Sequence, residues 1–310
     1  MPNIKPVISI IIVSYNVKDY LCKCIDSLLV QTNSVTEIIV VDNGSTDGSC
    51  EAIKSNYPSV KLIRNTVNTG FSAANNLGIA VASGDIILLL NPDTQLLDIS
   101  CLFSLNQYFN SLEFTGILAP KLINSDGTNQ VSYWHFPRVT DILFELFYLH
   151  RKSYKDESIT PFEIEGASGA ALCFRKHLIE EIGGMDEALF WMEDIDFCYR
   201  AHKAGKKIIY HPAIKILHHG GKSSVNKYNI TIPNQVMSKV KFFKKHGSVS
   251  AFYFASFLTF FFIITRLLAF TALTLTLNGV CRQKANAYAI ALKVYFGYIL
   301  YGKSDIISDK

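Results

Sequence analysis

The feature that most constrains the fold is an alternation, between residues 7 and 93, of short apolar runs with segments of helical spacing. Each apolar run is rich in Val, Ile or Leu and ends in turn-forming residues, as buried strands do. The predicted strands are Val7 to Val13, Glu37 to Val41, Val60 to Arg64 and Ile87 to Leu90, and the predicted helices are Tyr20 to Val30, Ser49 to Asn56 and Ser72 to Val81. Short β-α-β crossovers put parallel strands into one sheet. We therefore expect an α/β fold with a mostly parallel, Rossmann-like sheet flanked by helices.

The fourth run ends abruptly at Asn91-Pro92-Asp93. Pro92 has no backbone N–H to donate, so the strand cannot continue through it, and Asp93 is presented at the carboxyl end of the strand. Ligands of open α/β sheets bind at that edge, where a carboxylate could hold a divalent cation and the phosphates of a nucleotide. The alternative is that Asp93 only forms a turn with Thr94. The loops after the first two strands, residues 14–16 and 42–47, should share the edge and complete a nucleotide site.

Three acids follow two aromatic residues in the second half of the chain. Glu193-Asp194-x-Asp196 comes directly after Phe190 and Trp191. Any one of these acids could simply stabilise the start of a helix, predicted here from Asp194 to Lys203. A carboxylate beside Trp191, with a sugar against the ring, could instead be the base that deprotonates an acceptor hydroxyl.

A last strand is predicted from Lys207 to Tyr210. The loop from His218 to Ser223 is the second polar constellation. A lone histidine is more often structural than a ligand. Beside Asp93, however, a neutral imidazole could complete a metal site, since Mn²⁺ accepts mixed oxygen and nitrogen ligands better than Mg²⁺ does. Gly220 and Gly221 would let the backbone approach phosphate, and Lys222 would supply charge. Neither GxxxxGK[ST] nor GxGxxG after the first strand is present, which argues against a P-loop and against dinucleotide binding.

Composition excludes several other classes. The chain has 310 residues, is 49% hydrophobic and carries a net charge of +4, which does not suggest nucleic acid. Its seven cysteines are scattered without a CxxC pair, and the odd count favours a reducing compartment over a disulfide framework. Residues 1–6 hold no apolar run, so we expect no signal peptide and a chain on the cytoplasmic side.

The region from Ala251 to Leu277 is apolar, with no acid and one base, Arg266. Its uninterrupted part, Ala251 to Thr265, is 15 residues long, shorter than the roughly 20 that span a bilayer. Basic residues precede it, namely Lys239, Lys241, Lys244 and Lys245. We expect peripheral attachment to an anionic membrane face rather than a spanning helix; burial against a partner subunit is the alternative. The predicted domains are residues 1–248, catalytic, and 249–310, helical. Oligomeric state stays open, a homo-oligomer included.

Several stretches together resemble one family. They are VSIIIVSYN, EIIVVDNGSTDGS, NTGFSAANNLGI, LLLNPDT, GASGAALCFRK, GGMDEALFWMEDIDFCYRAHKAGKKIIYHPA and HHGGKSS, covering about residues 7–224 in the family's order. The sequence resembles the inverting family-two glycosyltransferases with the A-type fold, especially the rhamnosyltransferase-like branch.

The resemblance implies roles residue by residue. Asp93 and His218 would bind Mg²⁺ or Mn²⁺ on the donor diphosphate, and Asp194 would be the general base with support from Glu193. The implied substrate-binding residues are Ser14, Tyr15 (against the nucleobase), Asn16, Asp42 (to base or ribose), Asn68 and Asn76 (shaping the donor pocket), Gly70, Asn91, Gly169, Trp191 and Lys222. Asn91 replaces the first aspartate of the common Asp-x-Asp pattern, which implies weaker metal affinity. Residues 133–137 lack the arginines expected there.

The expected function is single-displacement transfer of a sugar, with rhamnose from dTDP-rhamnose as the leading candidate, to a glycan or lipid-linked acceptor in cell-surface polysaccharide synthesis. The expected place is the cytoplasmic face of the inner or plasma membrane. Two alternatives belong to other classes. A sugar nucleotidyltransferase would want a Gly-rich, Arg-containing loop after the first strand, which Ser14-Tyr15-Asn16 does not offer. A catalytically silent sugar-nucleotide-binding scaffold would tolerate loss of Asp93, Asp194 and His218.

Overall fold

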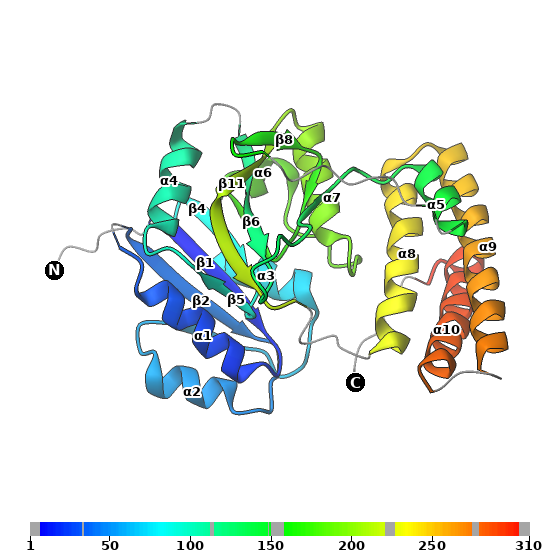
Figure 1. The fold of residues 1–310 in the computed structure, drawn as a ribbon, viewed down its shortest axis with the longest axis horizontal. Coiled ribbons are helices and arrows are strands. Elements are labelled where there is room, and N and C mark those ends of the chain that lie inside the picture. Colours follow the sequence, from blue (N-terminus) through cyan, green and yellow to red (C-terminus); the bar gives the residue numbers. More distant parts are fainter. Residues whose placement is uncertain are drawn as a thin grey trace. The chain divides into compact units, whose positions relative to one another are not determined.

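The structure is a computed structural model that describes residues 7–32, 34–111, 115–147, 149, 158–220, 227–274 and 279–303 (Figure 1). The chain forms two compact units. The first consists of Met1–Phe136, Ser153–Asp186 and Asp194–Ser223, and the second of Pro137–Lys152, Glu187–Glu193 and Ser224–Lys310. The predicted division into a catalytic domain, residues 1–248, and a helical region, residues 249–310, stays a prediction. In the division by contacts, residues 224–248 belong to the same unit as the C-terminal helices.

The first unit begins with the predicted parallel half-sheet. Its strands are β1 (Ile8–Ser14), β2 (Thr36–Asp42), β3 (Lys61–Arg64) and β4 (Ile86–Leu90), and its helices are α1 (Lys18–Leu29), α2 (Ser49–Asn56) and α3 (Phe71–Val81). β1 pairs in parallel with β2 and β4, and β2 with β3. The predicted α/β alternation is confirmed, because right-handed crossovers leave few other arrangements for such short loops.

The rest of the sheet is mixed. Its order is β3-β2-β1-β4-β10-β6-β11-β5, with β8 on β11. The added strands are β5 (Thr94–Leu96), β6 (Thr115–Ile123), β8 (Phe162–Ile164), β10 (Ala171–Arg175) and β11 (Lys207–His218). β10 is antiparallel to both β4 and β6. It therefore starts at the edge where β4 ends, and this delivers the turn at residues 168–170 to that edge.

β11 is longer than the predicted strand Lys207 to Tyr210. It continues to His218, with an irregular register between His211 and Lys215 around Pro212, which cannot donate to the ladder. Its last residues pair with β5, so that His218 lies opposite Thr94. The sequence predicted His218 in a loop, whereas the structure places it at the end of a strand. Its partner in the register, Thr94, directly follows Asp93.

Helices cover both faces of this sheet (Figure 1). Alternate residues of β1 point to opposite faces, so Ile10 packs with α1 while Ile11 packs with α3. The first face also receives α2 and α4 (Cys101–Ser111), and the second receives α6 (Leu178–Ile182) and α7 (Glu193–Lys203). A small separate sheet pairs β7 (Tyr133–Trp134) with β9 (Gly166–Ala167).

The second unit is helical. It contains α5 (Val139–Leu146), α8 (Tyr228–His246), α9 (Val249–Leu273) and α10 (Gly279–Tyr301). Arg266 ends the apolar stretch of the sequence, but α9 continues through it, and the Arg266 side chain is buried inside the unit. Its Nη2 donates to the Glu145 carbonyl at 2.6 Å, and it lies over the Phe262 ring. Within the described residues, α9 is the one helix long and apolar enough to cross a membrane.

Candidate active site

Three strands of the first unit end together in polar residues. Ser14 and Asp42 are opposite each other in the β1–β2 register, and the Asn43 N–H donates to the Ser14 carbonyl at 2.8 Å. β4, on the other side of β1, ends at Asn91-Pro92-Asp93. The shared carboxyl edge that the sequence predicts is therefore where these loops lie.

Ser14 and Asp42 present buried oxygens at this edge. Oδ2 of Asp42 accepts from the Ser45 N–H at 3.0 Å. Among the described residues, no N–H or O–H group donates to Oδ1 of Asp42, and Oγ of Ser14 has no hydrogen-bond partner. Leaving a buried polar atom without a partner costs about 1–3 kcal/mol. A ligand that donates hydrogen bonds here would recover that cost.

Asn43 holds the loop at residues 65–70 beside this edge, a role that was not predicted from the sequence. Its Nδ2 donates to Oδ1 of Asn68 at 2.8 Å and to the Gly70 carbonyl at 3.2 Å. Its Oδ1 accepts from Asn65 and from both the N–H and the hydroxyl of Thr69, each at 3.0 Å. Asn68 and Gly70, the latter at φ +90°, thus form a loop built around Asn43. The signal available beforehand was its position directly after a predicted strand.

Tyr15 and Asn16 follow β1 at the same edge. Asn16 adopts φ +54° and is tied to the neighbouring loop, since its Oδ1 accepts from the Thr46 N–H at 2.8 Å. Its own N–H donates to Oγ of Ser45 at 2.9 Å. Tyr15, partly exposed, is carried by this cross-linked loop.

Asp93 and His218 lie side by side at the β4 corner. Oδ1 of Asp93 is 3.3 Å from Nε2 of His218, and both side chains are almost buried. The His219 N–H donates to the Asp93 carbonyl at 2.9 Å, which holds the two segments together. Nδ2 of Asn91 lies 3.4 Å from the same Nε2. The structure thus brings three predicted site residues into contact.

This donor set suits a divalent cation that also binds substrate. Among the described residues, no group of three or more His, Cys, Asp and Glu side chains could hold a metal. Two protein ligands are nevertheless what a site needs when phosphate oxygens and water supply the other positions. One carboxylate oxygen with one imidazole nitrogen fits Mn²⁺ in particular.

Asp194 lies in the first turn of α7 and faces the turn before β10. Its Oδ2 accepts from the Gly169 N–H at 2.8 Å, and its Oδ1 accepts from the Ile195 N–H at 2.8 Å. Burial raises the pKa of Asp194 to about 6, although these N–H groups favour the charged form. A side chain on Gly169 would meet Asp194, with its Cβ only 3.3 Å from that of Asp194.

Asp194 is linked to the corner of Asp93 and His218 through one turn. The residue after Gly169 is Ala170, whose carbonyl accepts from the Asn91 N–H at 2.9 Å. The turn at 168–170 therefore holds the carboxylate on one side and the Asn91-Pro92-Asp93 corner on the other. The predicted base and the predicted metal ligands thus lie on the two sides of one short turn in the first unit.

Asp196 and Asn76 hold the backbone instead. Asp196, fully buried, pairs with Nε of Arg200 at 2.8 Å, and Nη2 of Arg200 donates to the Gly184 carbonyl at 2.7 Å. The Asn76 amide donates to the Met185 carbonyl and accepts from its N–H, at 2.9 and 2.8 Å. The sequence assigned Asn76 to the donor pocket; the structure shows its amide bonded to the loop at 184–185.

Three further predicted site residues, Trp191, Glu193 and Lys222, do not lie at this edge among the described residues of the first unit. Trp191 and Glu193 belong to the second unit. Trp191 is 44% exposed and adopts φ +82°, a conformation that is costly for a bulky residue. Its ring contacts that of Phe190, whose carbonyl accepts from the Ser238 hydroxyl. Lys222 lies outside the described residues.

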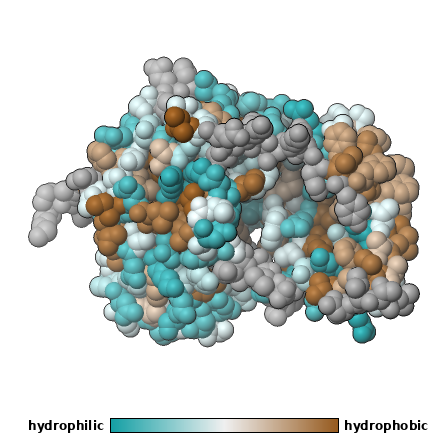
Figure 2. Space-filling model, in the orientation of Figure 1, coloured by the Kyte–Doolittle hydropathy of each residue, from teal (hydrophilic) through white to brown (hydrophobic). Residues whose placement is uncertain are grey.

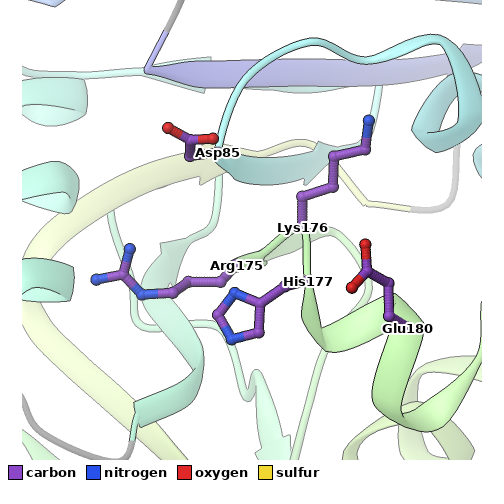
Figure 3. A pocket seen from close by; sticks show the side chains of 5 residues that line it. All are labelled: Asp85, Arg175, Lys176, His177 and Glu180. Carbon is purple, nitrogen blue, oxygen red and sulfur yellow. The ribbon is translucent and has the colours of Figure 1, made fainter.

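A depression of about 530 Å³ in the first unit lies at the opposite edge of the sheet. It is lined by Asp85, Arg175, Lys176, His177 and Glu180 (Figure 3). Asp85 precedes β4 and Arg175 ends the antiparallel β10, so this is the edge away from Asp93. Arg175 and Lys176 point apart, toward Asn110 and the Ala82 carbonyl (Figure 3). None of its lining residues was a predicted site residue.

The family of the chain is established by its similarity to known proteins. The profile of glycosyl transferase family 2 matches residues 9–183, more than half of the chain. The chain belongs to glycosyl transferase family 2. The match includes the Ser14, Asp42, Asn91–Asp93 and Gly169 segments, while Asp194 and His218 follow it.

This family 2 glycosyltransferase also has similar curated relatives. It is 28% identical over 239 residues to N-acetylglucosaminyl-diphospho-decaprenol L-rhamnosyltransferase of Mycobacterium tuberculosis, which covers 70% of this chain and 78% of the relative. It is 28% identical over 204 residues to the low-salt glycan biosynthesis hexosyltransferase of Haloferax volcanii, covering 63% of this chain and 62% of that one.

A solved structure extends the likeness to the fold of almost the whole chain. A mannosyltransferase of Pyrobaculum calidifontis, in complex with GDP-Man and Mn²⁺, superposes with a TM-score of 0.59 at 17% identity. The match covers 97% of this family 2 glycosyltransferase and 89% of that chain. At this identity the likeness concerns the fold, and it confirms the predicted glycosyltransferase A-type architecture.

Proposed function

We propose that this family 2 enzyme transfers a hexose, with rhamnose as the leading candidate, from a nucleoside-diphosphate sugar to a lipid-linked glycan, inverting the anomeric configuration. One observation carries the proposal: the turn at 168–170 holds Asp194 on one side and the Asn91–Asp93 corner with His218 on the other. A base and a diphosphate-binding corner are thereby held at one edge. This is the arrangement that a single displacement requires.

The donor nucleoside would bind at the β1–β2 end of the edge. The buried oxygens of Ser14 and Asp42 accept hydrogen bonds, so they suit the N–H groups of a base or the hydroxyls of a ribose. Tyr15 would lie against the base, and Asn16, Asn68 and Gly70 would shape the surrounding loops. The diphosphate then extends toward the β4 corner.

Asp194 would act on the acceptor hydroxyl. With a pKa of about 6 its carboxylate is mostly ionised at neutral pH, yet basic enough to take a proton. Gly169 and Ile195 orient its two oxygens, each of which keeps a second lone-pair direction. As the proton moves to Asp194, the acceptor oxygen bonds to the anomeric carbon and the carbon–phosphate oxygen bond breaks on the opposite face.

The leaving diphosphate would depart from the Asp93 corner. When bound there by Asp93 and His218, Mg²⁺ or Mn²⁺ supplies positive charge to the diphosphate. Asn91 lies within reach of the same corner through its amide. The Mycobacterium relative is named for a decaprenol-linked acceptor, and this supports a polyprenyl-diphosphate glycan as the acceptor here.

The second unit would attach the enzyme to the cytoplasmic face of the plasma membrane. Residues 227–303 contain ten Lys and Arg and no Asp or Glu, so the rest of the +4 chain carries a net charge of −6. One side of α9 is exposed and aromatic, and Figure 2 shows hydrophobic side chains gathered at the right of the view, where Figure 1 draws α9 and α10. The exposed residues of this α9 stripe are Val249, Tyr253, Phe254, Phe257 and Phe261. Cationic charge beside exposed aromatic rings suits an anionic bilayer surface.

The packing of α9 favours a helix that lies on the membrane. Its other side is buried in the second unit, where Arg266 contacts Glu145 and the Glu145 carboxylate pairs with Lys239 of α8. α8 and α10 both pack along α9 and carry further charges. If this bundle crossed the bilayer, those charges would enter hydrocarbon. The insertion free energy of each would be unfavourable by roughly 2.5–3.5 kcal/mol on the scale from translocon experiments.

The test is transfer of rhamnose from dTDP-rhamnose to a polyprenyl-diphosphate N-acetylglucosamine, compared between the wild type and Asp194→Asn. We expect turnover to fall by about 10²–10⁴-fold, with donor affinity kept, since Asp194 contacts none of the nucleoside-binding residues. Near-normal turnover in the variant would remove Asp194 as the base. Wild-type enzyme inactive with every nucleotide sugar, with and without Mn²⁺, would remove the transferase proposal.

A further inference from the structure

The imidazole of His218 is held from its far side. Its Nδ1 lies 2.6 Å from Oε1 of Gln130, while its Nε2 faces Asp93. A carbonyl oxygen only accepts hydrogen bonds, so at this distance Nδ1 must carry the proton. Nδ2 of Asn91, a donor, lies 3.4 Å from Nε2, which agrees with a lone pair on that nitrogen.

The orientation of the Gln130 amide is itself determined by its neighbours. Nε2 of Gln130 donates to Oδ1 of Asn124 at 2.8 Å. Nδ2 of Asn124 donates to the Thr128 hydroxyl oxygen at 3.0 Å, and that hydroxyl donates to Oδ1 of Asp126 at 2.6 Å. Because an ionised carboxylate only accepts hydrogen bonds, the Thr128 hydroxyl must donate to Asp126. Asn124 must then donate to Thr128, and Gln130 to Asn124. The direction of every bond therefore follows from Asp126.

The four residues sit on a tight hairpin turn after β6. The Gly127 N–H donates to the Asn124 carbonyl at 2.9 Å, and the Asn124 N–H to the Thr128 carbonyl at 2.8 Å. Gly127 takes φ +82°, which favours glycine. The two hydrogen bonds from Thr128 hold the pKa of Asp126 below its usual value, so Asp126 stays ionised. The chain of bonds thus starts from a carboxylate that the turn itself holds through two hydrogen bonds.

We propose that this hydrogen-bond relay fixes the tautomer of His218 and so prepares a cation site with Asp93. The relay residues are Asp126, Thr128, Asn124 and Gln130, none of which was a predicted site residue. With the proton held on Nδ1, the Nε2 lone pair and the Asp93 carboxylate face each other at 3.3 Å. Two acceptors so close repel unless a cation or a proton lies between them.

Loss of the relay would reverse the tautomer. Without an acceptor opposite Nδ1, the proton of neutral His218 is better placed on Nε2, where it donates to Asp93. That proton occupies the position of the cation, which must displace it. Outer hydrogen-bond partners of metal-binding histidines typically contribute 10–100-fold to metal affinity. Gln130 is thus a positioning residue, and its role in catalysis rests on the proposed function.

The experiment is ¹⁵N NMR of histidine-labelled, metal-free full-length protein above neutral pH, with His218→Gln to assign the signal. We expect wild-type His218 to carry its proton on Nδ1 and Gln130→Leu to move it to Nε2. Gln130→Glu keeps an acceptor opposite Nδ1 and should keep the wild-type tautomer. Gln95→Leu is the matched control, since Gln95 contacts the neighbouring His219 instead.

A titration with Mn²⁺ alone, followed by water-proton relaxation, measures the consequence. We expect Gln130→Leu to bind Mn²⁺ about 10–100-fold more weakly than the wild type and Gln95→Leu to bind as the wild type does. An Nε2–H tautomer in the wild type overturns the relay, and so does an unchanged tautomer in Gln130→Leu. If Gln130→Leu does not fold, the wild-type tautomer still decides. Because neither measurement uses donor or acceptor, failure of the relay is distinguishable from failure of the transferase proposal.

Discussion

At the scale of single residues, two neighbouring acids have opposite environments. Asp194 is held by backbone N–H groups at the edge of the sheet, whereas Asp196 is fully buried against Arg200. Each residue of an α-helix turns by about 100°, so residues two apart lie on nearly opposite sides of the helix. The same short acidic run therefore supplies one carboxylate that we propose as the base and one that holds α7 to the loop at 182–184.

If Asp194 is the base, its raised pKa should set the acid limb of the pH profile. A base must be deprotonated, so kcat/KM should be near its plateau at pH 7–8 and fall as the pH drops through about 6. Initial rates across pH 5 to 8 at saturating metal measure this. An acid limb near pH 4, the range of an ordinary carboxyl group, would contradict the assignment of Asp194.

At the scale of elements, the contact of α4 with β11 contains a buried histidine. His211 is 1% exposed, and its ring centroid lies 3.7 Å from that of Tyr108 of α4, with the two rings tilted by 53°. Neither ring nitrogen has a hydrogen-bond partner among the described residues. Burial lowers the pKa of His211. The α4–β11 contact thus carries a neutral imidazole that cannot accept a proton without cost.

This contact should make stability depend on pH. As the pH falls below about 6.5, the ordinary value of histidine, the unfolded chain takes up a proton that the folded His211 refuses, so the free energy of unfolding decreases. We expect His211→Phe to lose less stability than the wild type between pH 7.5 and 5.5 in denaturant titrations. His177→Gln, at an exposed histidine, is the control. Equal pH dependence in the wild type and His211→Phe would contradict this account.

At the scale of the whole molecule, charge and apolar surface are divided between the units. The helices α8, α9 and α10 of the second unit carry all their formal charge as Lys and Arg. The α9 stripe continues through ring contacts from Phe257 to Phe261, Phe260 and then Phe296 of α10. The first unit carries the sheet and its edge. This division agrees with the proposal that the second unit binds a membrane surface and the first unit binds the donor.

Membrane binding should depend on the stripe and on charge. We expect Phe257→Asp/Phe261→Asp to co-sediment much less than the wild type with vesicles containing anionic phosphatidylglycerol, because charge cannot enter the apolar layer. Wild-type binding should weaken with salt and on neutral phosphatidylcholine vesicles. Ile99→Asp, at a 60% exposed aliphatic residue of the first unit, is the control. Equal binding by all three proteins would refute the stripe as the membrane surface.

Much of the fold and part of the site were predictable because they depend on local patterns. The strand–helix alternation up to Leu90, the turn at Pro92 and the start of α7 follow from spacing, β-branched residues and the missing N–H of proline. The extension of β11 was not predictable, because its last residues are held by β5 across more than a hundred positions of chain. Gln130 and Asn43 were missed because an amide has no pattern of its own until its partners are known.

The sequence by itself determined which side chains stand at strand ends, because periodicity and turn chemistry act between near neighbours. Only the tertiary structure decided which of those side chains meet. It joined His218 to Asp93, set Asp194 against Gly169, gave Asn76 to the Met185 backbone and enclosed Arg266 within the second unit. The reason is that strand pairing and burial connect residues far apart in the chain, and their geometry is fixed only when the whole sheet and bundle close.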